Sequence, residues 1–337
     1  MLSSYTILLA FNTLASSVFG SPFPPPSRRD ADFNSVRTRL KHDHSGKGGD
    51  DPGKYFHEST FHPHYDGRFA EKPLPYDEKR VHLTALVQTY LSTMNDIGAE
   101  TWIMHGSLLG WFWNKKIMPW DSDIDVQMSE NSMTHLADYY NMTVHHFKLP
   151  GVPKGRDYML EVNPNWINGS ITDTLNVIDA RWIDTDSGLF IDITTLRPNL
   201  TAQEEGHEGY MMCKDKHHYN HSDIFPLRES TFEDIPVKIP YAYTDLLIEE
   251  YSHEALAVRD FENHHFDQLT MEWKPISTTS GGKKAPKMSS KDHGFHLPKG
   301  ISKAALARLY AGRTPGESDV GKPPPPAEEV NTASIIV

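Results

Sequence analysis

The sequence predicts an α/β domain of the α+β kind, in which helices flank a sheet, between disordered N- and C-terminal segments. In residues 101–126, a short apolar stretch, a Gly-Ser turn, an apolar helical pattern and an acidic strand pattern follow one another. In residues 176–196, two runs rich in branched and aromatic residues are joined by Thr-Asp-Ser-Gly, the pattern of two strands and a turn. These patterns place strands beside helices within one domain.

Each expected element follows from a periodicity and a boundary signal. In residues 78–98 the apolar side chains fall on one helical face, and Gly98 supplies the stop. Lys115 and Lys116 suit the negative end of the helix that precedes them. In chain order we expect a helix at 78–98, a strand at 101–104, a tight turn at 105–107, a helix at 108–113, an acidic strand at 120–126, a helix at 131–140, and strands at 158–162, 176–184 and 188–196.

Three aspartates alternate with other residues in the acidic run: Asp121, Asp123 and Asp125. In a strand, alternate side chains share a face, and at ~3.3 Å per residue neighbouring carboxylates would stand about 6.6 Å apart. Such charges repel each other, and Mg²⁺ prefers carboxylate oxygens and shares its shell with substrate phosphates. The run therefore indicates a metal site for a phosphate-bearing substrate, with a solvated acidic face as the competing interpretation. A calcium loop is excluded, because Val126 and Ser132 stand where that loop needs Gly and Glu.

Gly106 and Ser107 precede the predicted helix at 108–113. The free backbone N–H groups and the positive end of a helix suit a phosphate, and Ser107 is placed to cap the helix. A Gly-Ser helix start is by itself more often simple capping. Followed by the acidic strand, it indicates a phosphate site.

Asp192 stands between apolar residues on the last predicted strand, where an unpaired carboxylate is costly. It is either a third metal ligand or a carboxylate satisfied by the backbone or by Arg181. Arg181 in turn either clamps a donor phosphate through two hydrogen bonds or forms a salt bridge that supports Asp192 or Asp184.

The Gly-Ser pair, the acidic run and Phe-Ile-Asp-Ile-Thr at 190–194 together resemble the LicD/fukutin-like family, most closely its fungal mannosylphosphorylation branch. The resemblance runs from about residue 65 to residue 251. It implies a nucleotidyltransferase-like core, in which helices flank a small mixed β-sheet, and a late helix at 241–251.

The resemblance also implies roles for single residues. Gly106 and Ser107 would grip the donor phosphates. Asp123 and Asp125 would be the paired metal ligands, Asp192 the third carboxylate and Asp121 a further ligand, with Mg²⁺ or Mn²⁺ as the cofactor. The acceptor hydroxyl needs a base within hydrogen-bond reach, and Asp192 and Asp121 are the two candidates.

Members of this branch transfer a phosphorylated group from a nucleotide-linked donor to a glycan hydroxyl. The resemblance therefore implies transfer of mannose phosphate from GDP-mannose to cell-wall or glycoprotein glycans, a reaction that depends on positioning and charge neutralisation. Two alternatives stay open: a non-catalytic regulator or partner of a mannosylphosphate transferase, with a Golgi glycosyltransferase as the partner, and a choline- or alditol-phosphate transferase that uses a CDP-linked donor. A glycosyltransferase with a D-x-D motif is disfavoured, because a Gly-Ser helix start lies immediately upstream.

Charge and cysteine content restrict the function further. The 337-residue chain has a net charge of −12 and no basic stripe, which disfavours a nucleic-acid partner. Cys213 is the only cysteine, so no internal disulfide is possible.

The ends of the chain predict a secretory protein. Residues 1–20 predict a signal peptide, with a short uncleaved membrane anchor as the alternative. Residues 21–64 predict a linker, residues 65–275 the domain, and residues 276–337 a tail too poor in apolar side chains to fold alone. Four Asn-X-Ser/Thr sites favour the secretory pathway, with the Golgi lumen or the exterior as destination: Asn141, Asn168, Asn199 and Asn220.

Overall fold

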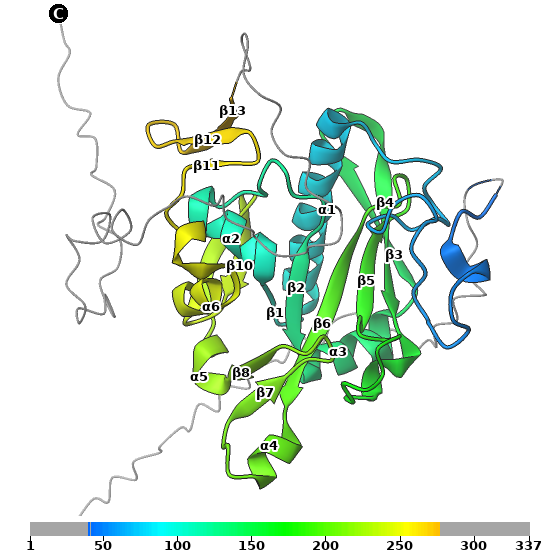
Figure 1. Cartoon of the computed structure of the whole chain (residues 1–337). Helices are drawn as coiled ribbons and strands as arrows, with labels where there is room; N and C mark the ends of the chain where they lie inside the picture. The colour runs from blue at the N-terminus through cyan, green and yellow to red at the C-terminus, as the bar shows by residue number, and fades with distance from the viewer. Residues whose placement is uncertain (1–39, 41, 277–337) are drawn as a thin grey trace, which may run out of the picture. The chain divides into compact units, whose positions relative to one another are not determined.

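A mixed sheet forms the centre of the fold, with the strand order β1–β2–β6–β5–β4–β3 (Figure 1). The computed structural model describes residue 40 and residues 42–276. β2 and β6 run parallel, and the other neighbouring pairs are antiparallel. The strands, with β7 and β8 attached beside β6, are β1 (Thr101–Ile103), β2 (Asp125–Ser129), β3 (Thr143–Leu149), β4 (Val152–Val162), β5 (Ala180–Asp184), β6 (Phe190–Pro198), β7 (Tyr210–Met212) and β8 (His218–Asn220).

Helices and two small antiparallel sheets complete the described part of the chain. The predicted mixed α/β fold, with a mixed sheet flanked by helices, is confirmed. The helices are α1 (Tyr76–Ile97), α2 (His105–Asn114), α3 (Glu130–His135), α4 (Leu200–Glu204), α5 (His221–Ile224) and α6 (Tyr243–Ala255), with the short turns η2 (Gly46–Gly48), η3 (Leu136–Tyr140) and η4 (Pro164–Ile167). The small sheets are formed by β9 (Arg228–Phe232) with β10 (Ile235–Ile239), and by β11 (Asp260–Phe261), β12 (His264–Asp267) and β13 (Glu272–Pro275).

The long helix α1 packs an apolar face against β5, β6 and β10. Leu86, Val87, Tyr90 and Met94 on this face are fully buried. Burying each such side chain stabilises the fold by ~1.5–3 kcal/mol. The helix ends at Gly98, whose φ of 73° suits glycine. The helix predicted at 78–98 is confirmed, although its first turn begins two residues earlier.

Two predicted boundaries near the acidic run are wrong. The tight turn expected at 105–107 is already helical, since α2 begins at His105. The acidic strand begins only at Asp125, so Asp121 and Asp123 lie in the loop that precedes β2. The Asp121 carboxylate accepts a hydrogen bond from the Ser122 N–H at 3.0 Å. Such a local bond gives the backbone an alternative to strand pairing.

Residues 42–64, predicted as part of a linker, pack against the sheet instead. Tyr55 and Phe56 are buried, and the Tyr55 hydroxyl donates to the Glu161 carboxylate at 3.1 Å. Tyr65 then forms an isolated bridge with Leu189 beside β6. The local composition gives no sign of this packing, because the partners lie more than 100 residues away in the sequence.

Several predictions fall on the ends of the chain. The predicted signal peptide at 1–20 lies outside the described residues, as do residues 21–39 of the predicted linker and residues 277–337 of the predicted tail. In the described part of the chain, no helix combines the length and the apolar character that a membrane span requires.

Candidate active site

Two of the predicted metal ligands lie on neighbouring strands in direct register. β2 begins at Asp125, and its parallel pairing places Asp125 opposite Asp192 of β6. Neighbouring strands lie ~4.8 Å apart. The pairing of β2 with β6 therefore brings Asp125, the last aspartate of the acidic run, beside Asp192, although the two are far apart in the sequence.

The first turn of α2 lies against two carboxylates of the acidic run. A Cβ placed on Gly106 would stand 3.2 Å from Asp121 Oδ2 and 3.8 Å from Asp125 Oδ2. The missing side chain thus leaves space between these carboxylate oxygens and the backbone of the helix start. The first N–H groups of a helix have no partner within it, so this space borders backbone donors as well as acids.

Ser107 ties the helix start to the acidic strand. Its hydroxyl is buried and accepts a hydrogen bond from the Asp125 N–H at 3.0 Å. The predicted N-cap role is wrong, because the N-cap position belongs to Met104 and no side chain caps α2. Ser107 instead fixes the position of the Asp125 backbone relative to α2.

Burial and like charge raise the pKa values of three carboxyls at this site. Burial, followed by the charge of Asp123, raises the pKa of Asp125 to about 7. The same two causes raise the pKa of Asp121 well above its usual range. Burial also raises the pKa of Asp192, despite the opposing charge of Arg181. The site therefore holds more negative charge than its surroundings stabilise.

Mg²⁺ and Mn²⁺ fit the chemistry of these residues, because both prefer oxygen ligands and their charge would relieve the repulsion. The space beside Gly106 lies between two such oxygens. Among the described residues, however, no three His, Cys, Asp or Glu side chains stand as a ready metal-binding set. Binding a metal ion would therefore require the carboxylates to move closer together, or a ligand to supply the remaining coordinating atoms.

Arg181 holds Asp192 from the neighbouring strand β5. Its Nε donates to Asp192 Oδ1 and its Nη2 to Glu58 Oε1, both at 2.7 Å. The guanidinium lies between two rings, 3.8 Å from the centre of Phe190 and 4.7 Å from that of Phe56. The predicted salt bridge with Asp192 is thus confirmed. The predicted phosphate clamp has no such support, since the side chain is only 2% exposed.

Two side chains that precede the acidic run in the sequence, His64 and Lys79, interact with its carboxylates. His64 Nδ1 lies 3.3 Å from Asp123 Oδ2. Lys79, in the first turn of α1, has its pKa lowered by burial, and the charges of Asp121 and Asp123 oppose that lowering. The sequence assigned neither residue to the site, because His64 belongs to a segment interpreted as linker and Lys79 to a helix interpreted as core packing.

A second group of polar side chains, from the start of α2, from α6 and from the residue before β8, lies beside Gly106. His105 Nδ1 lies 2.9 Å from the Glu250 carboxylate, and the His105 and His217 ring centres are 4.4 Å apart. Burial by itself lowers the pKa of His105, but the hydrogen bond to Glu250 and the charge of Glu250 outweigh burial, so the pKa is raised overall. His105 adjoins Gly106 in the motif used to recognise the family, whereas no local pattern indicates Glu250.

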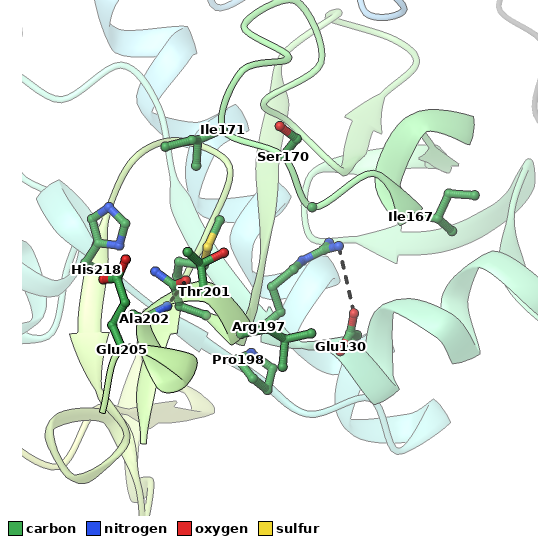
Figure 2. A pocket seen from close by; sticks show the side chains of 14 residues that line it. Glu130, Ile167, Ser170, Ile171, Arg197, Pro198, Thr201, Ala202, Glu205 and His218 are labelled. Carbon is green, nitrogen blue, oxygen red and sulfur yellow. Dashed lines mark hydrogen bonds and ion pairs between the residues drawn. The ribbon is translucent and has the colours of Figure 1, made fainter. Parts of the chain in front are cut away.

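A pocket of about 690 Å³ lies at the other end of β6 (Figure 2). Figure 2 shows Arg197 and Glu130 facing each other within it, with an Nη1–Oε1 distance of 3.8 Å. Asp192 and Arg197 are five residues apart on one strand, so about 16 Å separates them at ~3.3 Å per residue. The pocket is therefore separate from the carboxylates.

The region that contains the carboxylates is similar to a known protein family and to two curated proteins. Residues 98–242 match the family model described as LicD/FKTN/FKRP, nucleotidyltransferase domain. Mannosyltransferase regulator 4 of Saccharomyces cerevisiae is 29% identical over 204 residues, which cover 59% of this chain and 17% of that protein. Mannosyltransferase regulator 14 of the same yeast is 28% identical over 158 residues, which cover 44% of this chain and 17% of that protein. The chain thus spans 17% of the length of each of these curated relatives.

Proposed function

We propose that this protein, whose residues 98–242 match the LicD/FKTN/FKRP nucleotidyltransferase model, transfers a phosphorylated sugar from a nucleotide-linked donor to a glycan hydroxyl. Mannose phosphate from GDP-mannose is the favoured cargo, and Mg²⁺ or Mn²⁺ the cofactor. The observation that carries this proposal is the approach of Asp121 and Asp125 to Gly106 at the start of α2, with Asp192 in register beside Asp125.

The donor phosphates would lie at the start of α2. Backbone N–H groups and the helix dipole favour negative charge there, and Gly106 lets phosphate oxygens approach the backbone. Asp121, Asp123, Asp125 and Asp192 would hold the divalent cation, which when bound neutralises charge on the phosphates. Ser107 would keep α2 and β2 in register through its bond to Asp125.

The transfer itself joins the acceptor hydroxyl oxygen to the phosphorus that bears the sugar. The bond from that phosphorus to the bridging oxygen breaks, and the nucleoside monophosphate leaves with the electron pair. The hydroxyl proton passes to a carboxylate, for which Asp192 and Asp121 are the candidates. Arg181 donates a hydrogen bond to Oδ1 of Asp192, and would thereby fix the direction in which the other carboxylate oxygen points.

The test is product analysis with the purified full chain, Mn²⁺, and GDP-mannose, CDP-choline and CDP-ribitol in turn, with a mannan acceptor. A phosphodiester-linked product and release of GMP, both lost in Asp123→Ala/Asp125→Ala, are expected. Asp96→Ala is the matched control, because this exposed aspartate lies 17 residues beyond Lys79 on α1, about 25 Å along the helix. Release of CMP would name a CDP-linked donor instead, and release of GDP would contradict phosphosugar transfer.

A regulatory role is the second candidate, favoured by the names of the two yeast relatives. In that case the domain would bind a Golgi glycosyltransferase without turning over a donor. No product with any donor, from protein shown to be folded, would favour the regulator.

We also propose that the protein acts in the secretory pathway, in the Golgi lumen or outside the cell, with an uncleaved N-terminal anchor as the alternative to a signal peptide. Among the predicted glycosylation sites, Asn168 and Asn220 are exposed. Asn141 is 4% exposed, and its side-chain oxygen accepts from the Val162 N–H at 2.9 Å. We therefore expect Asn168 to carry a glycan more readily than Asn141.

A further inference from the structure

An aromatic pocket lies at the opposite end of α2 from Gly106. It has a volume of about 410 Å³, and its rings come from Trp111, Phe112 and Trp113 at the end of α2 and from Tyr243 at the start of α6. Figure 1 shows α2 and α6 beside each other, with β11, β12 and β13 next to the end of α2. We infer that this aromatic pocket binds the glycan acceptor as a neutral oligosaccharide, an inference that rests on the proposed function.

The rings are held in fixed orientations that leave part of their surface open. Trp111 Nε1 donates to Ser230 Oγ at 2.8 Å, and Trp113 Nε1 donates to the Ala255 carbonyl at 3.1 Å. The Trp111 and Tyr243 rings meet edge to face, with centres 5.0 Å apart. The protein satisfies both indole N–H groups, so what these half-buried rings offer a ligand is apolar surface. Rings fixed in this way lose little conformational entropy when a ligand binds.

The lining matches the two-sided chemistry of a sugar ring, which has an apolar C–H face and polar hydroxyl edges. Aromatic surface suits the face, and the polar groups needed for the edges are few. Asn114 lines the pocket and donates to the Met271 carbonyl at 3.0 Å, while its buried Oδ1 has no partner among the described residues. Lys115 is the one charged residue among those that line the pocket. This lining favours a neutral ligand with hydroxyl donors.

The pocket and the carboxylate site lie along the same pair of helices, α2 and α6. Phe112 follows Gly106 by six residues, about 9 Å along the helix at 1.5 Å per residue. α6 runs beside α2, so Tyr243 meets Trp111 at one end and Glu250 meets His105 at the other. An extended ligand lying along this helix pair would thus reach from the rings to the space beside Gly106.

A cluster of rings also connects the pocket with the acidic run. Trp113 packs on Trp273 with centres 5.0 Å apart, and Trp273 packs on Trp120 at 4.9 Å. Trp120 immediately precedes Asp121. The packing therefore fixes the position of the pocket relative to the first carboxylate.

The concavity favours a small ligand over a protein segment, since a volume of about 410 Å³ falls within the ~300–1,000 Å³ of small-molecule sites.

Direct binding of a neutral α-mannohexaose to the full chain, without any donor, tests the inference. Binding would be followed by titration calorimetry and by the change in tryptophan fluorescence expected when a sugar covers Trp111. We expect Tyr243→Ala to weaken binding at least ~10-fold and Tyr243→Phe to retain it, because the ring is the contact. Leu269→Ala is the matched control, since this residue is 96% exposed and does not line the pocket.

The outcomes separate this inference from the proposed function. Asp123→Ala/Asp125→Ala should bind the oligosaccharide like the wild type, even though turnover is lost. Equal binding by wild type and folded Tyr243→Ala would overturn the inference, as would no binding by the wild type. The inference would also be wrong if the pocket instead mediated dimerisation that Tyr243→Ala abolished. In a working enzyme, Tyr243→Ala should raise the KM for the acceptor and leave the KM for the donor unchanged.

Discussion

Ser107 shows how one side chain sets the geometry of the candidate site. Its hydroxyl bonds to the N–H of Asp125, the residue at which β2 begins and at which β2 faces β6. A serine here therefore fixes the distance between the helix start and the acidic strand. The same bond explains why a small polar side chain is buried at a position where sequence reasoning expects a cap.

Ser107→Ala should destabilise the protein by about 1–3 kcal/mol, because the partly buried Asp125 N–H loses its acceptor. Unfolding in urea would measure the change, with the exposed Ser170→Ala as the control. Activity should fall as well, since α2 and β2 lose their register. An unfolding midpoint equal to that of the wild type would contradict the linking role.

Glu58 stabilises the fold in a pH-dependent way through its bond to Arg181. Burial by itself raises the Glu58 pKa, but the charge of Arg181 and the hydrogen bonds from Lys54 and Arg181 lower it to about 2. A lowered folded-state pKa gives stability that is fully present above the unfolded value of 4.5 and disappears as the pH falls towards 2.

Glu58→Gln should therefore destabilise the protein at pH 7 and flatten the fall in stability between about pH 4.5 and pH 2. Thermal unfolding across this range would measure both effects. Glu71→Gln, at an exposed glutamate, is the control. Parallel pH profiles for the wild type and Glu58→Gln would show that the interaction with Arg181 contributes no stability.

At the scale of single elements, the start of α2 combines a backbone requirement with a functional one. Gly106→Ala places a methyl group 3.2 Å from Asp121 Oδ2, in the space proposed for donor phosphates. Alanine is a better helix former than glycine, so stability should change by less than about 1 kcal/mol. Activity should fall by ~10²-fold, because a misplacement of about 1 Å costs that much. Steady-state kinetics beside an unfolding curve would separate the two effects, and full activity would contradict the proposed donor position.

Periodicity predicts the elements themselves well, because it reflects which face each one buries. The helix predicted at 78–98 and the hairpin around 185–189 appear in the structure for this reason. The acidic pattern predicts chemistry but not the strand boundary, since Asp121 bonds locally. Contacts between distant segments, such as Glu58 with Arg181, leave no local pattern. The register of β2 with β6 is likewise set by the whole sheet.

At the scale of the whole molecule, four carboxylates from two strands and a loop are held near one another against their repulsion. Their repulsion should therefore be relieved either by removing one carboxylate charge or by binding a cation, and the cation needs the charge that the substitution removes. Asp125→Asn keeps the size of the side chain and removes its charge, so the metal-free protein should be at least as stable as the wild type. The same variant should lose any stabilisation by Mn²⁺.

The wild-type protein should unfold at a higher temperature in Mn²⁺ or Mg²⁺, because a ligand that binds only the folded state at 100 times its Kd adds about 2.7 kcal/mol. At about 2–4 °C per kcal/mol, the rise should be several degrees. Calorimetry with and without the ion, on wild type, Asp125→Asn and the control Asp96→Asn, would measure it. A rise in wild type and Asp96→Asn but not in Asp125→Asn would place the ion at the carboxylates. An equal rise in all three would place it elsewhere, and no rise in any would remove the metal from the proposed reaction and favour the regulatory role.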